Sequence, residues 1–435
     1  MKRVLSIIIL ALVLNACSRE KNHEKFFKDP LLYSTAVGSL TDVITHDIFS
    51  PPVASRIYAY ANLAAYEVLA ANNKKYKSLG SKLKEFPATP LPEKPVNTEL
   101  GSLLAFMYIG QELTFSKDST QKIIDNFFQL AEANGMPSEI SDNTRDYAKI
   151  VSKNVLAWSK KDSYKQTRSA IKYTVNSDEG RWTPTPPAYM PAIEPSWMKL
   201  RPVMIDSASQ FLPLPPTKFS KEKDSDFYKL ASEVHKMGTE LNDEQKAIAD
   251  FWDCNGFKMN VSGHVMFATK AMTPGGHWMG ITGIVCNNQK ADFEKTVYAY
   301  TGVSFAIMDA FIACWNTKFA YNLLRPETYI NRYINNTWTP YLQTPPFPEY
   351  TSGHSIISSA SATVLTNIFG EKTSFVDNTE RRWGWPDRKY ENVKEAAQEA
   401  ALSRMYGGIH YREGMEEGLK EGQKLGEFVY NKLKL

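Results

Sequence analysis

The sequence predicts an all-α fold, made of helical bundles and one proline-rich irregular strap. Apolar residues recur at helical spacing over most of the 435 residues, whereas the alternation expected of strands is scarce. The exception is the stretch 183–216, in which nine prolines exclude regular helix. These observations favour a large helical protein crossed by one irregular segment.

Length and composition are those of an ordinary globular protein with a large core. A chain of 435 residues is long enough for two or three domain-sized units. Aromatic residues make up 12% of the chain, which suits a core that contains ligand cavities. The formal net charge is only +4, so we expect no nucleic-acid partner.

Residues 1–16 have the pattern of a bacterial signal peptide. A short basic start precedes an apolar stretch that is too short to span a bilayer. It ends in LNAC, which resembles the lipoprotein box and implies cleavage before Cys17 and lipidation of its thiol. Ser18 resembles an outer-membrane sorting signal, so we expect a lipid-anchored protein of the cell envelope. An ordinary secretory signal is the alternative, and we expect no membrane-spanning stretch in the rest of the chain.

The expected helices of the N-terminal region, residues 17–182, follow this segment. Residues 50–72 begin with a serine cap and prolines in the first turn, followed by a long apolar stripe. Helical patterns continue over 96–114, 118–134 and 138–162.

Residues 183–219 are expected to form the irregular strap. Aromatic residues stand among or beside its prolines, namely Trp182, Tyr189, Trp197 and Phe211. Because large aromatic side chains gain much by burial, we expect the strap to pack over the helices in an ordered form.

Residues 220–435 are assigned to a helical domain that carries the chemistry. Helical patterns lie near 226–238, 242–252, 290–324, 353–369, 391–405 and 410–432. Beyond Cys17 the cysteines are odd in number and lack C-x2-C spacing; they are Cys254, Cys286 and Cys314. This pattern predicts buried free thiols, and neither a disulfide framework nor a zinc site.

The first polar cluster of this domain is KFAYNLLRPE, residues 318–327. Lys318 and Arg325 are seven residues apart and so lie on nearly one helix face. Pro326 disfavours helical geometry at Arg325 and places its guanidinium at a helix end. Two cations on one face repel each other unless an anion lies between them. Considered alone, the cluster could equally be a solvated face.

The second cluster is EYTSGHSIISSA, residues 349–360. Ser352 is suited to cap the apolar helix that follows, and Gly353 would let a ligand approach the backbone closely. The free N–H groups and the dipole at a helix start attract an anion. His354 falls in that first turn, within reach of the same anion. Considered alone, such a cap is often only structural.

Two further clusters complete the set. In SRMYGGIHYREG, residues 403–414, the glycine turn could fold Arg404 and His410 toward one point. The stretch 251–279 holds the polar residues Asp253, His264 and His277 among glycines and aromatics. The first three clusters together suit a tetrahedral oxyanion, since cations neutralise it and the helix start donates hydrogen bonds.

The order and spacing of these motifs resemble a known superfamily. K-x6-R-P, S-G-H and S-R-x5-H resemble the three signature motifs of the vanadate-dependent haloperoxidase and type 2 phosphatidic-acid phosphatase superfamily. The segments SPPVASRIYAYANLAAYE, GRWTPTPPAYMPAIEPSW, FWDCN and GGHW are similar to bacterial vanadium haloperoxidases, in particular the iodide-oxidising group. The resemblance covers most of the chain after the signal peptide.

The resemblance implies a vanadate cofactor and two substrates, hydrogen peroxide and halide. The peroxide would oxidise the halide to hypohalous acid. His410 would be the one protein ligand of vanadium, and His354 would act as the acid–base group on the opposite side. The other residues would hold the oxygens of vanadate: Lys318, Arg325 and Arg404 by charge, Ser352 and the Gly353 N–H by hydrogen bonds. Trp315 and Phe347 flank the motifs and either line the halide approach or pack in the core.

The chain departs from the family pattern in two places. The third motif usually carries Asp four residues after its histidine, but Gly414 stands there, with Glu413 and Glu417 nearby. A backbone carbonyl or another group would then have to orient His410. In the second motif Thr351 replaces the usual proline, which we expect to be tolerated.

Asp253 is interpreted either as a partner of Arg404 or as a simple surface or cap residue. His264 and His277 are expected to be structural residues and not ligands.

Two other functions remain open at this point. The same cage could run phosphoester hydrolysis as a vanadate-inhibited acid phosphatase, with His410 as nucleophile and His354 protonating the leaving oxygen. A lipoprotein that only binds an oxyanion or a partner would not need both histidines. Among halides, iodide is the easiest to oxidise, and the resemblance favours it.

Overall fold

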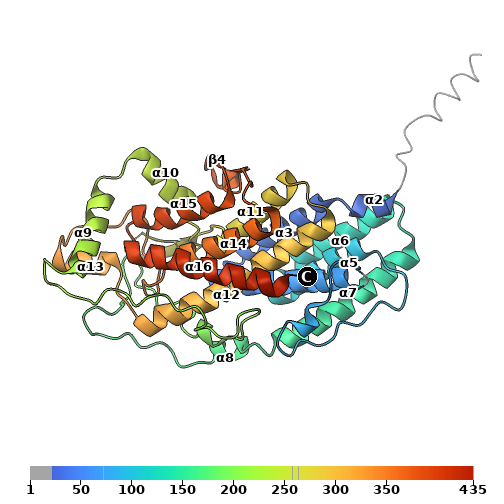
Figure 1. Cartoon of the computed structure of the whole chain (residues 1–435), viewed down its shortest axis with the longest axis horizontal. Coiled ribbons are helices and arrows are strands. Elements are labelled where there is room, and N and C mark those ends of the chain that lie inside the picture. The colour runs from blue at the N-terminus through green and yellow to red at the C-terminus, as the bar shows by residue number, and fades with distance from the viewer. Residues whose placement is uncertain (1–21, 72, 257, 263, 435) are drawn as a thin grey trace, which may run out of the picture.

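The computed structural model describes residues 22–71, 73–256, 258–262 and 264–434. The expected signal peptide and Cys17, the expected lipidation site, lie outside the described residues. Within them helices are the main secondary structure, as predicted (Figure 1). In the first half the helices are α2 (His23–Phe27), α3 (Pro30–His46), α4 (Pro51–Ala70), α5 (Thr98–Leu113), α6 (Lys117–Ala133), α7 (Ser138–Ser159) and α8 (Tyr164–Arg168).

The second half continues the helical pattern around two short hairpins. Its helices are α9 (Asp226–Thr239), α10 (Asp243–Phe251), α11 (Pro274–Asn288), α12 (Phe293–Tyr321), α13 (Pro326–Tyr333), α14 (Gly353–Phe369), α15 (Val393–Tyr406) and α16 (Arg412–Leu433). The antiparallel hairpins pair β1 (Lys258–Ser262) with β2 (Val265–Thr269) and β3 (Phe375–Asp377) with β4 (Arg388–Tyr390).

The two halves share one hydrophobic core. Helices α5, α6 and α7 lie toward one end of the long axis, and α9 and α13 lie toward the other (Figure 1). Between them α12 packs against α4 from the first half and against α14 and α16 from the second. Side chains of α3, α4, α5 and α7 join those of α11, α12 and α14 in a single buried cluster.

Helix α12 is the central element of this core. By length and composition it could span a membrane, so the expectation that no later stretch is long and apolar enough is wrong for this helix. Its apolar window is entirely buried inside the protein, which is the environment of a core helix. A helix that is apolar on all sides fits a position surrounded by other helices.

Close packing between α14 and α16 brings two of the predicted motifs together. Glycines recur every four residues along α16, at positions 414, 418, 422 and 426. A Cβ atom at Gly422 would lie 2.3 Å from the Ile356 carbonyl oxygen, and one at Gly426 would lie 2.6 Å from the Ala360 carbonyl oxygen. Only glycine allows the two backbones to approach this closely. The start of α14 therefore lies against the start of α16.

The strap is ordered and is tied to the core by a buried carboxylate. Three backbone N–H groups of the strap, from Val203, Met204 and Ile205, donate to the Asp309 carboxylate on α12 at 2.7, 2.7 and 2.9 Å. Asp309 is fully buried, and burial raises its pKa to about 6 despite these three donors. Apart from the 3₁₀ turn Trp197–Lys199, the strap forms no helix in the described residues.

Replacement of Asp309 by asparagine is expected to destabilise the protein by about 1–3 kcal/mol. Asparagine offers one acceptor oxygen where the carboxylate offers two, so a buried N–H loses its partner. Urea unfolding measures the change, and Asp206→Asn on the exposed side of the strap is the matched control. Equal stability of Asp309→Asn and the parent protein would contradict this role of Asp309.

Most helices follow the periodicity of the sequence, and α14 has the predicted bounds. The sequence pattern did not indicate α3, α11, α13 or the two hairpins. Helix α11 begins inside the stretch 251–279, where Pro274 and two glycines interrupt the apolar pattern. The proline takes the first turn, where its missing N–H costs nothing, and Thr273 caps the helix.

Candidate active site

The first three predicted clusters converge on one buried site. After burial, the groups that lower the pKa of His410 come from all three clusters: Arg325 and Lys318 from the first, His354 from the second and Arg404 from the third. The lysine and both arginines are at most 2% exposed, which is rare for cations without carboxylate partners. Such a group of buried cations is stable only where an anion offsets their charge.

The start of α14 forms one wall of the site. Ser352 is the N-cap, and its hydroxyl accepts from the Ser355 N–H at 3.4 Å. Apart from the chain neighbours of Gly353 and its own helix backbone, no described atom lies within 4 Å of the position a Cβ would take there. This space and the free N–H groups of the first turn form a cradle for an anion, as the sequence predicted.

Lys318 lies near the C-terminal end of α12 and supports the turn before α14. Its ammonium donates to the carbonyl oxygens of Pro348, Glu349 and Thr351 at 3.0, 2.9 and 2.6 Å. Burial lowers the pKa of Lys318 to about 8. Since a lysine has three N–H donors, all of them serve the backbone in this arrangement. Lys318 thus contributes charge to the site and fixes the turn that leads to Ser352.

The two arginines each keep an unused donor inside the site. Arg325 is the N-cap of α13, so it stands at a helix end as predicted, and burial lowers its pKa to about 10. It donates to the carbonyl oxygens of Phe347 (2.9 Å) and Ile409 (2.8 Å), while Arg404 donates to that of Trp252 (2.8 Å). Within the described part of the chain, Arg325 Nη2 and Arg404 Nε are buried without a hydrogen-bond partner.

His410 lies in the turn two residues before α16, and its tautomer follows from its contacts. Arg325 Nη1 approaches His410 Nε2 at 3.1 Å, and a guanidinium can only donate. His410 Nε2 therefore accepts, and the Nδ1–H donates to the Glu349 carboxylate at 2.6 Å. Burial and the charges of Arg325 and Lys318 hold the pKa of His410 well below its ordinary value. The ring stays neutral, and its Nε2 lone pair, which accepts from Arg325 in this structure, is the one that a ligand would take up.

Glu349 supplies the carboxylate that the third motif lacks. Its Oε1 accepts from both His410 Nδ1 and the Tyr411 N–H, the latter at 3.1 Å. A Cβ at Gly414 would lie 2.4 Å from this same oxygen. The glycine at the usual aspartate position thus makes room for an acid that arrives from the start of the second motif. Glu349 was not among the predicted site residues, although it opens the second motif.

His354 faces the same site from the first turn of α14. Burial, followed by the positive charge of Arg404, holds its pKa well below the ordinary value. Its Nε2 is buried and lacks a hydrogen-bond partner among the residues that the structure describes. A neutral imidazole with one unused nitrogen can give or take a proton from a bound ligand.

A cavity opens beside these groups. It is lined by His354, Arg404, His410 and Gly353 on one side and by apolar residues on the other, including Trp315 and Phe347. The cavity leaves about 40 Å³ for the centres of water-sized molecules, compared with ~10–15 Å³ for a single water. The rings of Trp315 and Phe347 lie 5.0 Å apart, and Phe347 also lies 5.1 Å from the charged groups of Lys318 and Arg325.

The residues of the fourth cluster lie in three different settings. Asp253 approaches Lys258 at 3.6 Å, and the structure shows no direct ion pair with Arg404 among the described residues. The charge of Arg404 still acts on it, since it opposes the increase in the pKa of Asp253 that burial causes. His264 is exposed beside the β1–β2 hairpin. His277 is fully buried outside the cage, where its Nε2 contacts Asp377 at 2.8 Å.

Glu421 on α16 gives the site a measurable pH dependence. Burial raises its pKa to about 8, and its carboxyl accepts from the Thr351 hydroxyl at 3.0 Å. The folded-state pKa of Glu421 lies above the value of about 4.3 for an unfolded chain, so folding favours its protonated form. Its contribution to the stability of the protein is therefore complete below about pH 4 and is lost as the pH rises to about 8.

Glu421→Gln is therefore expected to gain stability relative to the parent as the pH rises from about 5 to 8, by a few kcal/mol, and then to level off. Thermal unfolding across this range measures the difference. Glu427→Gln, on the same helix and bonded to Gln423, is the control and should show no such trend. A constant difference between Glu421→Gln and the parent at all pH values would contradict the raised pKa.

The site fits a small tetrahedral oxyanion. Three unsatisfied nitrogens, the open cradle at Gly353 and a neutral imidazole lone pair all belong to one buried group of residues. Oxyanions accept hydrogen bonds on every side, and arginine donors match them well. The donor set of several cations and one neutral imidazole suits vanadate, which can take one nitrogen ligand while its oxygens are neutralised.

Comparisons with known proteins agree with this fold and site. A family model described as the VCPO second helical-bundle domain matches residues 298–435. A crystal structure described as the first bacterial vanadium-dependent iodoperoxidase is 46% identical, with a TM-score of 0.88, covering 93% of this chain and 96% of that one. A search of curated sequences found no match.

More distant structures share the fold alone. A holo-type bacterial vanadium-dependent chloroperoxidase is 15% identical with a TM-score of 0.66, covering 89% of this chain and 93% of its own. The apo-type structure of a bacterial vanadium-dependent chloroperoxidase is 14% identical with a TM-score of 0.64, covering 88% of this chain and 94% of its own.

The fold and the oxyanion cage thus define a helical protein of the vanadium-haloperoxidase type. With 46% identity over nearly its whole length to a solved member, the chain belongs to the family of bacterial vanadium-dependent haloperoxidases.

Proposed function

We propose that this protein is a vanadate-dependent haloperoxidase that oxidises halide with hydrogen peroxide to hypohalous acid. The observation that carries the proposal is the neutral His410 imidazole, with its Nε2 lone pair held among buried cations and its Nδ1–H bound to Glu349. Bound vanadate would supply a Lewis acid that activates peroxide for attack by halide.

The residues of the chain would bind, orient and exchange protons. Arg325 Nη2, Arg404 Nε and the first N–H groups of α14 would hold the oxygens of the cofactor, with Lys318 adding charge. His354 Nε2, unused and neutral, would take a proton from incoming peroxide and return one to the departing oxygen. Burial of these groups excludes bulk water, which strengthens every charge interaction in the site.

Iodide is the proposed halide. The most similar structure reported above is described as an iodoperoxidase, and the cavity wall formed by Trp315 and Phe347 is aromatic and uncharged. Such a wall suits a large, weakly hydrated, polarisable anion. Under one set of conditions, rates with iodide, bromide and chloride would rank the three halides, and a faster rate with bromide or chloride would contradict this choice.

The proposal is tested by reconstitution. Protein freed of bound oxyanion is mixed with orthovanadate and then given peroxide with iodide, and triiodide formation is followed by absorbance. We expect no oxidation without vanadate and saturation near one equivalent. Iodide oxidation that does not depend on vanadate would contradict the proposal.

Phosphoester hydrolysis is the rival that the same experiment can decide. Phosphate has the same shape as vanadate and a similar charge, and His410 could attack a phosphate ester as a nucleophile. A chromogenic phosphomonoester added to the vanadate-free protein should give negligible turnover. Rapid turnover that vanadate inhibits would favour the phosphatase instead.

We also propose that the protein is anchored in the cell envelope through a lipid on Cys17. The proposal rests on the sequence LNAC at residues 14–17. When expressed in a bacterium with two membranes, the parent protein should sediment with the outer membrane, and Cys17→Ala should not. Equal membrane association of both forms would contradict lipid anchoring, because one lipidated cysteine is the only attachment proposed.

A further inference from the structure

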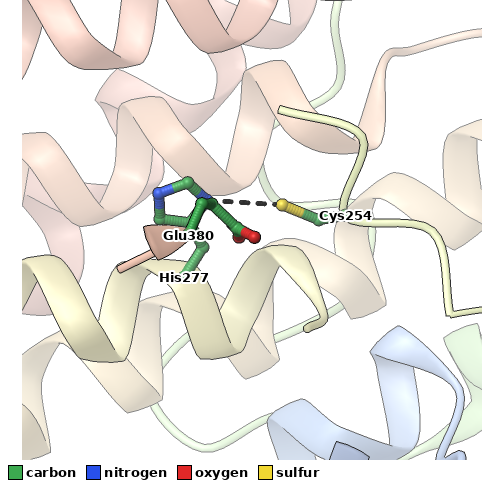
Figure 2. A group of neighbouring side chains, drawn as sticks. All are labelled: Cys254, His277 and Glu380. Carbon is green, nitrogen blue, oxygen red and sulfur yellow. Dashed lines mark hydrogen bonds and ion pairs between the residues drawn. The ribbon is translucent and has the colours of Figure 1, made fainter. Parts of the chain in front are cut away.

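A cluster of side chains that could hold a metal ion lies beside the active cavity. Cys254, His277 and Glu380 each offer a ligand atom, and these atoms all lie within 4.8 Å of one another (Figure 2). Cys254 follows α10, His277 lies in the first turns of α11, and Glu380 follows β3. The cluster is separate from the oxyanion cage, but the Cys254 side of it also lines the cavity.

All three side chains are buried, and one of them lacks a partner. Cys254 is 3%, His277 0% and Glu380 6% exposed. Glu380 Oε1 has no hydrogen-bond partner within the described ranges, although it lies 3.5 Å from His277 Nδ1. A buried carboxylate oxygen without a hydrogen-bond donor is costly, and a cation bound between it and the imidazole would stabilise it more closely than the ion pair with His277 at 3.5 Å.

Two of the distances between ligand atoms match those of a tetrahedral metal site. Typical bonds of about 2.3 Å from zinc to sulfur, 2.0–2.1 Å to nitrogen and 2.0–2.2 Å to oxygen place neighbouring ligand atoms about 3.3–3.7 Å apart. Here Cys254 Sγ lies 3.3 Å from His277 Nδ1, and Nδ1 lies 3.5 Å from Glu380 Oε1. The Figure 2 view shows the thiol and the carboxylate beside the imidazole ring.

The outer contacts of His277 are those of a metal ligand. Its Nε2 lies 2.8 Å from Asp377 Oδ2, so Nε2 is a donor, and Nδ1 is the nitrogen that would bind a metal ion after losing its proton. Asp377 is itself held, since its Oδ1 accepts from the Thr379 N–H at 3.0 Å and hydroxyl at 2.7 Å. The ring also stacks on Trp252, with ring centroids 4.4 Å apart.

We propose that Cys254, His277 and Glu380 bind a divalent transition-metal cation, with Zn²⁺ preferred. A thiolate, an imidazole and a carboxylate are zinc's usual ligands, and the two anions would neutralise its charge. This inference does not depend on the proposed function. It revises two sequence interpretations, namely that His277 is purely structural and that the cysteine spacing excludes a zinc site, because the ligands come from three separate segments.

The metal would stiffen one wall of the oxyanion cage. The carbonyl oxygen of Trp252, two residues before Cys254, accepts from Arg404 Nη1. Fixing Cys254 to α11 and to the segment after β3 would hold this carbonyl, and so Arg404, in place. These metal ligands are positioning residues and would not touch substrate.

Metal binding is tested directly on the whole protein, purified without an affinity tag and treated with a chelator. Equilibrium dialysis against Zn²⁺ should give one bound equivalent in the parent protein. Co²⁺ should give a sulfur-to-cobalt charge-transfer band in the near ultraviolet. Both signals should be lost in Cys254→Ser and retained in Cys286→Ser, which replaces a buried thiol elsewhere.

Glu380→Gln is a second variant that keeps the shape of the site. It should fold, as judged by circular dichroism, and bind Zn²⁺ at least ten-fold more weakly than the parent. A parent protein that binds neither Zn²⁺ nor Co²⁺ would overturn the proposal and leave a thiol–imidazole–carboxylate hydrogen-bond chain. A charge-transfer band that persists in Cys254→Ser would also overturn it.

Discussion

Replacement of His410 by alanine is expected to abolish tight vanadate binding and, with it, halide oxidation. His410 Nε2 is a neutral nitrogen held against Arg325, and it would be the only protein atom bonded to vanadium. Without it the oxyanion is held by charge and hydrogen bonds alone. Equilibrium dialysis with vanadate measures the loss, and iodide oxidation by the same samples shows its consequence.

His354→Ala separates binding from chemistry. The cations, the α14 start and His410 remain, so this variant should keep measurable vanadate binding, while turnover falls about 10²–10⁴-fold through loss of the acid–base group. His264→Ala, on the exposed hairpin, is the matched control and should behave like the parent. Full activity in His410→Ala would contradict the assignment of the vanadium ligand.

Glu349→Gln is expected to weaken vanadate binding by about 10–100-fold, the usual cost of changing a residue that orients a metal-binding histidine. Glutamine can still accept a hydrogen bond, but it removes the charge that fixes the His410 tautomer at a distance of 2.6 Å. Glu413→Gln is the control, because Glu413 lies close by in sequence to His410 yet binds Thr217 of the strap. Similar losses in both variants would contradict a specific role for Glu349.

Moving the acid from position 349 to position 414 tests the role of Glu349 more sharply. Gly414→Asp alone should impair binding, since its Cβ would lie 2.4 Å from the Glu349 oxygen. In a Glu349→Ala background the same aspartate would have room and would restore the family arrangement. The double variant should bind vanadate more tightly than Glu349→Ala. No recovery would mean that Gly414 and Glu349 do not exchange roles.

The local motifs of the oxyanion cage could be predicted from sequence because their chemistry is local. Ser352 caps a helix, Gly353 leaves space, and Pro326 sets Arg325 at a helix end, each through contacts within a few residues. The long helices were equally predictable, since an apolar stripe at helical spacing decides their existence. Helix α11 was missed because its proline and glycines hide that stripe.

Contacts between distant segments could not be predicted from local sequence patterns. Glu349 meets His410 from 61 positions earlier in the chain, and only the close packing of α14 on α16 brings them together. Two features of the sequence together could have indicated this contact: Gly414 stands where the family usually has an acid, and Glu349, an acid, opens the second motif. The zinc-type ligands Cys254, His277 and Glu380 were hidden for the same reason, since no short spacing links them.

The central claim is that a single imidazole nitrogen of His410 bonds one vanadium atom inside a cage of cations. X-ray absorption at the vanadium edge tests it most directly, with protein loaded with one equivalent of vanadate. The account predicts one nitrogen among oxygen neighbours in the parent protein and oxygen alone in His410→Ala. An all-oxygen shell in the parent, or an unchanged nitrogen neighbour in the variant, would contradict it.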